Sequence, residues 1–364
     1  MLNRFPARAW TSACSLVTLL CGLLTATELR AEEYYQRYDL SLKPSHVTLA
    51  VQPTAYPLAF ISSTMLRDRL LKSDLHKHGL TLRSFAFRKG NDIVQVSTPE
   101  AFQMAFLGDM PTVNLSQRFP LAIAGLGKRN FSSVVARNFG RLEELRGRKI
   151  GYSAGSSSHL VLLRGLLAAK MSEKDVQLVP LEPAQMPDSL EDGRVDAFSA
   201  WEPTPAISLA RNPMNRAIYK GMSTDWVVLP MQVTQQQPEV ALALTASFAR
   251  AINWMRRSGN IETAAQWVFA DGAAFTGEAP KLPLARAIEI ARQDLLDVPG
   301  APATPSMVDG APPLSREFSF LREQGRISAS ASEAPLRQAF AYKGLATVMS
   351  DPKRYRLFSF DYER

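Results

Sequence analysis

The sequence contains very little cysteine. Its only two cysteines, Cys14 and Cys21, lie in the first 31 residues. That segment has the pattern of a secretory signal peptide, because two arginines precede a mostly apolar run at residues 10–24 and Ala31 offers a small residue for cleavage. The chain left after cleavage would form no disulfide. We therefore expect an exported protein that is stabilised by its core alone, which suits a bacterial periplasm.

Long apolar runs are also missing. No stretch after residue 31 is apolar for the roughly 20 residues that a membrane span requires. Two alternatives for the N-terminus are a membrane anchor and a lipidated Cys21. The first is less favoured because the apolar run is short. The second is less favoured because Leu20 stands where a small residue would be expected before a lipidated cysteine.

Histidine is scarce, and this limits the enzyme classes open to the chain. Residues Gly151–Gly155 match the G-x-S-x-G elbow of serine hydrolases, in a predicted strand–turn–helix context. The triad of such an enzyme needs a histidine late in the chain, but none of the four follows His159, which is six residues from Ser153. A hydrolase that uses Ser153 is therefore the alternative, and a chain without catalytic residues is the main hypothesis.

Motifs for metals, nucleotides and nucleic acid are lacking too. His76 and His78 are the one close histidine pair, and residues two apart point to different faces of a helix. Gly125 and Gly127 lack the third glycine of a dinucleotide loop, and no phosphate-binding lysine motif occurs. The formal charge is +8, but the basic residues are scattered. We expect no metal, no cofactor and no nucleic-acid partner.

What the sequence does contain is an alternation of short apolar strands and helices. With 364 residues, 46% of them hydrophobic, it is long enough for two domains with cores of their own. The alternation predicts a largely parallel sheet with helices on its faces. The predicted strands are residues 46–52, 80–88, 120–126, 132–137, 150–153, 176–181, 193–201 and 225–234. The predicted helices in the same region are 62–75, 98–105, a short helix that begins at residue 141, a helix that follows the turn at 155–158 and has no proline for fifteen residues, and 187–191.

The last third of the chain is predicted to be mainly helical. Residues 238–259 form the clearest helix, because Val240, Leu244, Phe248, Ile252 and Met255 recur on one face. Further helices are expected at 261–270, 282–296 and 315–324, with a proline-rich loop at 299–313. The aromatic tail after residue 350 is expected to pair along an edge.

Four loops follow the ends of predicted strands, where open α/β sheets bind their ligands. They are residues 52–56, 108–112, 155–158 and 201–204. Together they supply aromatic rings, small hydroxyl donors and two carboxylates, which is the composition of a small-molecule pocket. The candidate site residues are Gln52, Tyr56, Asp109, Thr112, Gly155, Ser156, Ser157, Ser158, Trp201 and Glu202.

Three segments together resemble the type II periplasmic substrate-binding proteins of the nitrate, sulfonate and taurine class of ABC importers. They are GRKIGYSAGSSSHLVLLRGLLAA (147–169), DVQLVPLEPAQMPDSLEDGRVDAFSAWEP (175–203) and FQMAFLGDMPTV (102–113). The resemblance runs in matching order from about residue 46 to residue 255. It implies an α/β fold of two lobes joined by two crossovers, with a hinged cleft between them.

The resemblance also implies how the chain is divided and what it binds. The signal peptide would be residues 1–31, the first part of lobe 1 residues 32–131, lobe 2 residues 132–234, and the remainder of lobe 1 with the tail residues 235–364. Ser156 and Ser157 would hold an anionic head, Trp201 and Glu202 would border its other end, and lobe 1 would close over it. The implied partners are a small organic anion and an ABC permease in the inner membrane, and we expect a monomer.

The ligand itself is left open by the sequence. An alkanesulfonate or an amino-sulfonate such as taurine is favoured, because the family resembled includes receptors of that class. Many sulfonate binders have WDP where this chain has Trp201-Glu202-Pro203, and the longer carboxylate would suit an amine or a polar tail. A thiamine-pyrimidine precursor and nitrate remain alternatives, although the lack of an arginine in the four loops weakens the case for nitrate.

Overall fold

The computed structural model describes residues 34–41, 45–298, 302 and 311–363. The predicted signal peptide, with both cysteines, lies outside the described residues, and so does most of the predicted loop at 299–313. Contacts divide the chain into residues 1–39 and residues 40–364. The named strands and helices all belong to the second unit. Among the described residues we find no helix whose length and hydrophobicity would let it cross a bilayer.

One mixed sheet runs through the unit, in the order β2-β1-β3-β8-β4-β7-β5-β6. β1 pairs in parallel with β2 and β3, and β5 pairs in parallel with β6 and β7, as predicted. The two groups are joined by antiparallel pairings of β8 with β3 and of β4 with β8 and β7. The strands are β1 (His46–Val51), β2 (Thr81–Ala86), β3 (Met104–Gly108), β4 (Leu121–Arg137), β5 (Lys149–Tyr152), β6 (Gln177–Pro180), β7 (Ala197–Ala200) and β8 (Asn215–Pro230).

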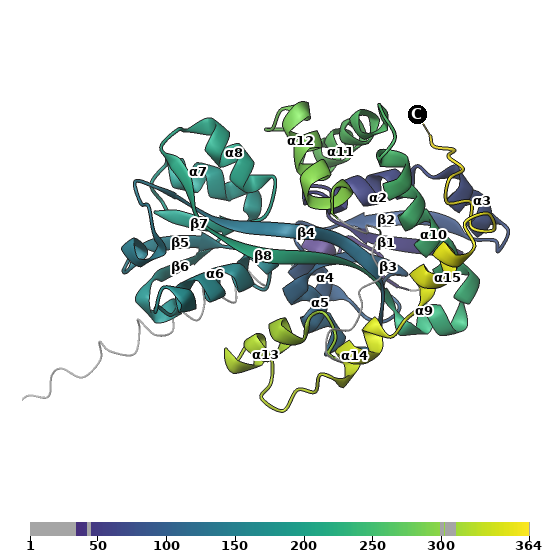
Figure 1. Cartoon of the computed structure of the whole chain (residues 1–364), viewed down its shortest axis with the longest axis horizontal. Coiled ribbons are helices and arrows are strands. Elements are labelled where there is room, and N and C mark those ends of the chain that lie inside the picture. Colours follow the sequence, from purple (N-terminus) through teal and green to yellow (C-terminus); the bar gives the residue numbers. More distant parts are fainter. Residues whose placement is uncertain (1–33, 42–44, 299–301, 303–310, 364) are drawn as a thin grey trace, which may run out of the picture. The chain divides into compact units, whose positions relative to one another are not determined.

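Figure 1 shows how helices cover both faces of this sheet. Beside β1–β3, helices α2, α10, α11 and α12 lie on one face and α4, α5, α13 and α14 on the other; beside β5–β7, α7 and α8 lie opposite α6. The helices are α2 (Leu58–Leu66), α3 (Arg69–His76), α4 (Gly90–Val96), α5 (Asp109–Ser116), α6 (Ser157–Ala168), α7 (Met186–Glu191), α8 (Thr204–Arg211), α9 (Met231–Gln236), α10 (Pro238–Met255), α11 (Asn260–Thr276), α12 (Leu284–Ala291), α13 (Ser315–Glu323), α14 (Ala334–Phe340) and α15 (Gly344–Ser350), and a π-helical turn spans Arg292–Leu296. Hereafter lobe 1 means β1–β3 with their helices, and lobe 2 means β5–β7 with theirs.

The two long strands β4 and β8 correct the sequence-based prediction. Residues 120–126 and 132–137 were expected as separate strands, and residues 215–224 were not expected as a strand. The two strands instead pair along almost their whole length, from Leu121 opposite Pro230 to Arg137 opposite Asn215, with three register shifts. Their polar middle remains a strand because backbone groups, not side chains, make the ladder. Both strands run from lobe 1 to lobe 2 (Figure 1).

A second correction concerns residues 98–105, which were predicted to be helical. The helix of this region is α4, which ends at Val96, whereas Met104–Gly108 is strand β3. All five residues of β3 are buried, between β1 on one side and β8 on the other. A short apolar run that is buried on both faces has no periodicity that separates a strand from a helix.

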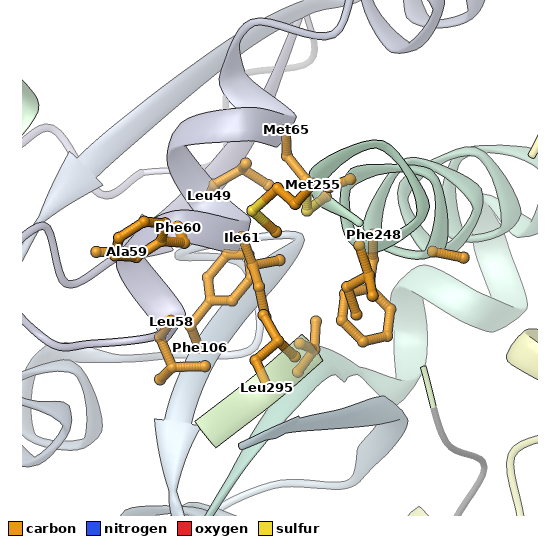
Figure 2. Close-up of a cluster of buried hydrophobic side chains, with 14 of the residues drawn as sticks. Leu49, Leu58, Ala59, Phe60, Ile61, Met65, Phe106, Phe248, Met255 and Leu295 are labelled. Atoms are coloured by element: carbon orange, nitrogen blue, oxygen red, sulfur yellow. The ribbon is translucent and has the colours of Figure 1, made fainter. Parts of the chain in front are cut away.

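The core of lobe 1 lies between the sheet and α2 and α10. The side chains of Leu49, Phe60, Phe106, Phe248 and Met255 are fully buried there and contact one another as a cluster (Figure 2). The predicted apolar face of α10 is thereby confirmed. Burying a side chain such as Phe248 contributes roughly 1.5–3 kcal/mol.

The C-terminus is helical for longer than predicted, because α14 and α15 follow α13. Beyond α15 the tail makes one isolated antiparallel bridge, between Tyr362 and Asp68 at the N-cap of α3, and not a strand at the edge of the sheet, so the predicted edge pairing was wrong. Next to it, Arg250 and Asp68 form a buried ion pair with 2.6 Å between nitrogen and oxygen. The last described residues therefore pack against the start of α3.

Candidate functional site

The loops that follow β1, β3, β5 and β7 converge, as the sequence predicts. A small cavity of about 20 Å³ is lined by residues from all four loops and from β8. In addition, the Tyr56 N–H donates to the carbonyl oxygen of Glu202 at 3.0 Å, which joins the loop after β1 to the loop after β7. The cavity is lined by Gln52, Ala55, Leu58, Gly90, Gly108, Pro111, Ser156, Ser157, Trp201 and Asp225.

Serines begin α6 on the lobe 2 side of this cavity. Ser156 is the N-cap residue: its hydroxyl accepts the His159 N–H at 3.2 Å and donates to the Ser153 carbonyl oxygen at 2.6 Å. The Oγ atoms of Ser156 and Ser158 are 3.0 Å apart, and both side chains are buried. The first-turn amides of α6 and the helix dipole favour a negative charge at this end.

Glycines let the two lobes approach closely here. Gly155 has φ +71°, and a Cβ at that position would lie 2.5 Å from Asn91 Oδ1. A Cβ on Gly108 would lie only 2.0 Å from Ser157 Oγ. A larger residue at position 108 would therefore displace Ser157.

Asp109 and Thr112 occupy the first turns of α5 and are buried. The Asp109 carboxylate accepts the Met110 N–H at 2.7 Å and the Thr224 N–H at 3.3 Å, and it also bonds to the Ser157 hydroxyl. Burial raises the pKa of Asp109 above its ordinary value. The Thr112 hydroxyl donates to the Gly108 carbonyl oxygen at 2.7 Å. These two residues fix the α5 end of the site, and neither lines the cavity.

The predicted aromatic wall is divided between two cavities. Trp201 lines the small cavity, whereas Tyr56 lines a larger one of about 120 Å³. The larger cavity has mainly apolar walls, which include Pro203 and Ile207 of lobe 2 and Phe269 of α11. Burial raises the pKa of Tyr56 well above its ordinary value. The sequence gives no signal that Tyr56 and Trp201 would line different cavities.

Glu202 makes contacts within the protein. Its Oε2 accepts the Ala206 N–H at 3.1 Å in the first turn of α8, and its carbonyl oxygen accepts the N–H of Tyr56. Burial raises its pKa above the ordinary value, and this outweighs the hydrogen bond from Ala206, which lowers it.

The side-chain amide of Gln52 is held by a hydrogen bond within lobe 1. Its Nε2 donates to the Phe106 carbonyl oxygen at 2.6 Å. Because an amide nitrogen carries two hydrogens, Gln52 keeps one N–H and its amide oxygen for a ligand in the cavity that it lines.

Sequence reasoning missed the charged residues of the crossover strands. Asp225 of β8 lies opposite Lys128 of β4 in the register, and Asp294 of the π-helical turn lies near both. Burial raises the pKa of Asp225 to about 6, against the opposing effect of Lys128. Lys128 is 1% exposed, and its Nζ donates to Ser223 Oγ at 3.3 Å. Charged residues inside apolar strands could have marked Lys128 and Asp225 as candidates. The pairing of β4 with β8, which brings the two residues together, cannot be predicted from the sequence.

The hydrolase alternative finds no support in the geometry. Ser153 is fully buried, and its Oγ has no hydrogen-bond partner among the described residues. His159 Nδ1 accepts the Gly155 N–H at 3.3 Å, and its Nε2 lies 3.4 Å from Glu173. Both ring nitrogens of His159 therefore have partners other than Ser153. Within the described ranges, no group of three or more His, Cys, Asp or Glu side chains could hold a metal.

Comparison with known proteins agrees with this arrangement. The model of the NMT1-like family matches residues 56–269. A putative aliphatic sulfonates-binding protein of Escherichia coli (strain K12) is 40% identical over 60 residues, which are 16% of this chain and only 19% of that protein. The taurine-binding periplasmic protein of the same strain is 24% identical over 307 residues, 79% of this chain and 89% of that protein. These relatives are named as binding proteins, in agreement with the prediction of a chain that is not an enzyme.

The fold has solved counterparts as well. A putative sulfonate ABC transporter protein, the periplasmic sulfonate-binding protein SsuA from Methylobacillus flagellatus KT, superposes with a TM-score of 0.61 at 16% identity, covering 89% of this chain and 99% of that one. The predicted two-lobe periplasmic-binding-protein fold is thereby confirmed. At this level of identity the likeness concerns the fold alone.

Proposed function

Because the chain belongs to the NMT1-like family, we propose that it is an exported solute receptor that delivers a small organic ligand to an ABC importer. One observation carries the proposal: four loops from both lobes meet at a cavity beside the N-terminus of α6. The names of the curated relatives, a sulfonate binder and a periplasmic taurine binder, support it. The proposed place of action is the periplasm, and the partner is the importer's permease.

The proposed ligand is an alkanesulfonate or an amino-sulfonate such as taurine. Ser156, Ser157 and the first-turn amides of α6 are the proposed contacts for the sulfonate. Between the two ligands, the carboxylates of Asp109, Asp225 and Glu202 favour the amino-sulfonate. A ligand with only a negative charge would meet a surplus of buried carboxyl groups.

We also propose that the two lobes close over the ligand by a hinge motion. Residues 132–234 are proposed to move as lobe 2 against residues 32–131 and 235–364, with the bend in β4 and β8, which connect the two. Gln52, Tyr56, Asp109 and Thr112 would close from lobe 1 onto Gly155–Ser158, Trp201 and Glu202 of lobe 2.

A second ligand class is favoured by one specific observation. The 120 Å³ cavity beside Tyr56 has mainly apolar walls, and an apolar cavity of about 150 Å³ can hold a benzene ring. A ring-bearing ligand such as a thiamine-pyrimidine precursor would use it. Nitrate would not, and it has little support from this site.

Titration calorimetry of the chain without residues 1–31 tests the proposal. The panel contains ethanesulfonate, taurine, a thiamine-pyrimidine precursor and nitrate, with thermal unfolding as a second measurement. One of the sulfonates is expected to bind and to raise the unfolding temperature by mass action. If only the pyrimidine precursor binds, the ligand belongs to the second class and not to the sulfonates. If no member of the panel binds, the chain is not a receptor for these ligands.

A further inference from the structure

His159 lies in the first turn of α6, directly behind the serines that face the small cavity. It is 3% exposed, and it is the one buried residue among the four histidines, all of which lie in the described ranges. Its ring packs against the ring of Tyr152 with centroids 4.7 Å apart, and it does not line the cavity. A buried imidazole needs a partner for each nitrogen, and both nitrogens have one.

The hydrogen bonds of His159 determine which ring nitrogen carries the proton. The Gly155 N–H donates to Nδ1 at 3.3 Å, so Nδ1 holds a lone pair. Nε2 lies 3.4 Å from Glu173 Oε1, and because a carboxylate oxygen accepts, Nε2 carries the hydrogen. The ring is therefore neutral while it holds Gly155. Burial lowers the pKa of His159, which favours the same neutral form.

The partners of His159 continue from the cavity to the C-terminal part of the chain. Glu173 lies in the short helical turn after α6, and its second carboxylate oxygen pairs with Arg326, which follows α13. A second ion pair joins α6 to α13, with 3.0 Å between Arg164 and Glu317. The imidazole is thus oriented by a carboxylate that is itself held in place.

The position of Gly155 matters to both lobes. Its φ is +71°, and a Cβ there would lie 2.5 Å from Asn91 Oδ1 of lobe 1, so its backbone packs directly against the other lobe. Ser156 and Ser157, which follow it, line the cavity. A shift of this turn would therefore move the proposed anion donors and the contact between the lobes together.

We infer that His159 is a positioning residue of the receptor, whose neutral ring, oriented by Glu173, holds the Gly155 N–H and keeps the serine turn of α6 in the geometry that receives an anionic group. The inference rests on the proposed receptor function. It adds a residue that acts on the ligand through the turn and does not touch it.

Two substitutions separate the roles of the two ring nitrogens. In His159→Asn the side-chain oxygen can take the place of Nδ1 and accept the Gly155 N–H, whereas in His159→Gln the amide lies near the place of Nε2 and reaches Glu173 instead. The matched controls are His78→Asn and His78→Gln, at an exposed position between α3 and β2. Calorimetric titration with taurine and with ethanesulfonate measures affinity, and chemical denaturation measures stability.

His159→Gln is expected to weaken the binding of the sulfonate by roughly 2- to 10-fold, the net value of one hydrogen bond. His159→Asn should bind nearly as tightly as the wild type, and both His78 variants should not differ from it. Intrinsic helix propensity ranks glutamine above asparagine, so a purely structural role predicts the opposite order. Equal affinities of the two His159 variants, or the opposite order, would overturn the inference.

The pH dependence of binding gives a second test. Protonation of Nδ1 turns the acceptor into a donor, so the affinity should fall at acid pH. The titratable and charged groups that face the ring are Glu173, Arg326 and Tyr152. Glu173 raises the pKa of His159 and Arg326 lowers it. The fall should therefore begin at higher pH in Arg326→Gln and at lower pH in Glu173→Gln, while the carboxyl groups of the cavity are the same in both. Shifts in one common direction would contradict the role of His159.

A measurement without ligand separates this inference from the proposed function. Amide exchange of Gly155, followed by nuclear magnetic resonance in protein labelled with ¹⁵N-glycine, should be faster in His159→Gln than in the wild type and in His159→Asn. If neither sulfonate binds the wild type, the sulfonate proposal is contradicted, and the exchange rate still decides the role of His159. Unchanged exchange of Gly155 in His159→Gln would overturn the inference even if a sulfonate binds.

Discussion

Among the single residues of this site, Asp225 has the clearest effect on stability, because its carboxyl group is buried. Its pKa of about 6 lies above the ordinary value near 4 for an aspartate. The folded protein therefore binds a proton more readily than the unfolded chain, and the free energy of unfolding should rise as pH falls from about 6 to about 4. The charged groups that act on Asp225 are Lys128, which lowers its pKa, and Asp109 and Asp294, which raise it.

Asp225→Asn is expected to stabilise the ligand-free protein above pH 7 by about 1–3 kcal/mol, because it removes a buried unpaired charge. Urea unfolding of wild type and variant at pH 4.5, 6 and 8 measures this difference. The gain should be largest at pH 8 and fall to about a third of that value at pH 4.5, where Asp225 is protonated in the folded protein but still largely ionised in the unfolded chain. A gain that does not change with pH would contradict a titrating Asp225.

Gly108 is the residue whose replacement should most directly disturb the contact between the lobes. In Gly108→Ala the new methyl group would collide with Ser157 Oγ, so that Ser157 must rotate and lose its bond to Asp109. We expect a loss of about 1–3 kcal/mol in unfolding free energy, with weaker ligand binding. Ser157→Ala in the same background removes the colliding oxygen and should recover part of the loss. Strict additivity of the two changes would argue against the contact.

At the scale of single elements, the start of α6 joins local folding to ligand binding. Ser156→Ala removes the N-cap bond to the His159 N–H and should cost about 0.5–2 kcal/mol of stability. Chemical denaturation measures it, with Ser359→Ala in the exposed tail as the control that changes little. A cost no larger than that of the control would show that the cap is dispensable.

Elements with a clear local pattern were predictable from the sequence. The face of α10, the β5–α6–β6 unit and the four loops all follow from periodicity, capping and turn residues. The strand nature of Met104–Gly108 and of residues 215–224 was not predictable, because pairing with distant strands decides it. The same reason hid Asp225 and Lys128, which become a site only when β4 and β8 lie side by side.

For the whole molecule, the arrangement of the lobes determines which parts of the ligand site come together. The loops of lobe 1 and lobe 2 meet through the Tyr56–Glu202 bond and the Gly108–Ser157 contact. β4 and β8 provide the physical link between the lobes, since each is one continuous strand. Sequence patterns located the four loops, and in the tertiary structure all four line the small cavity, while the loops after β1 and β7 also line the larger one.

The placement of the tryptophans allows ligand binding to be followed by the intrinsic fluorescence of the protein. Trp254 stacks on Trp267 with centroids 5.1 Å apart, and Trp226 packs edge-on against Phe340, so these three indoles are held by aromatic neighbours. Trp201 lines the ligand cavity instead. Ligand binding should therefore change the emission of Trp201 alone. A fluorescence titration is expected to respond in the wild type and in Trp267→Phe and to lose its signal in Trp201→Phe, and a full response in Trp201→Phe would mean that the ligand lies elsewhere.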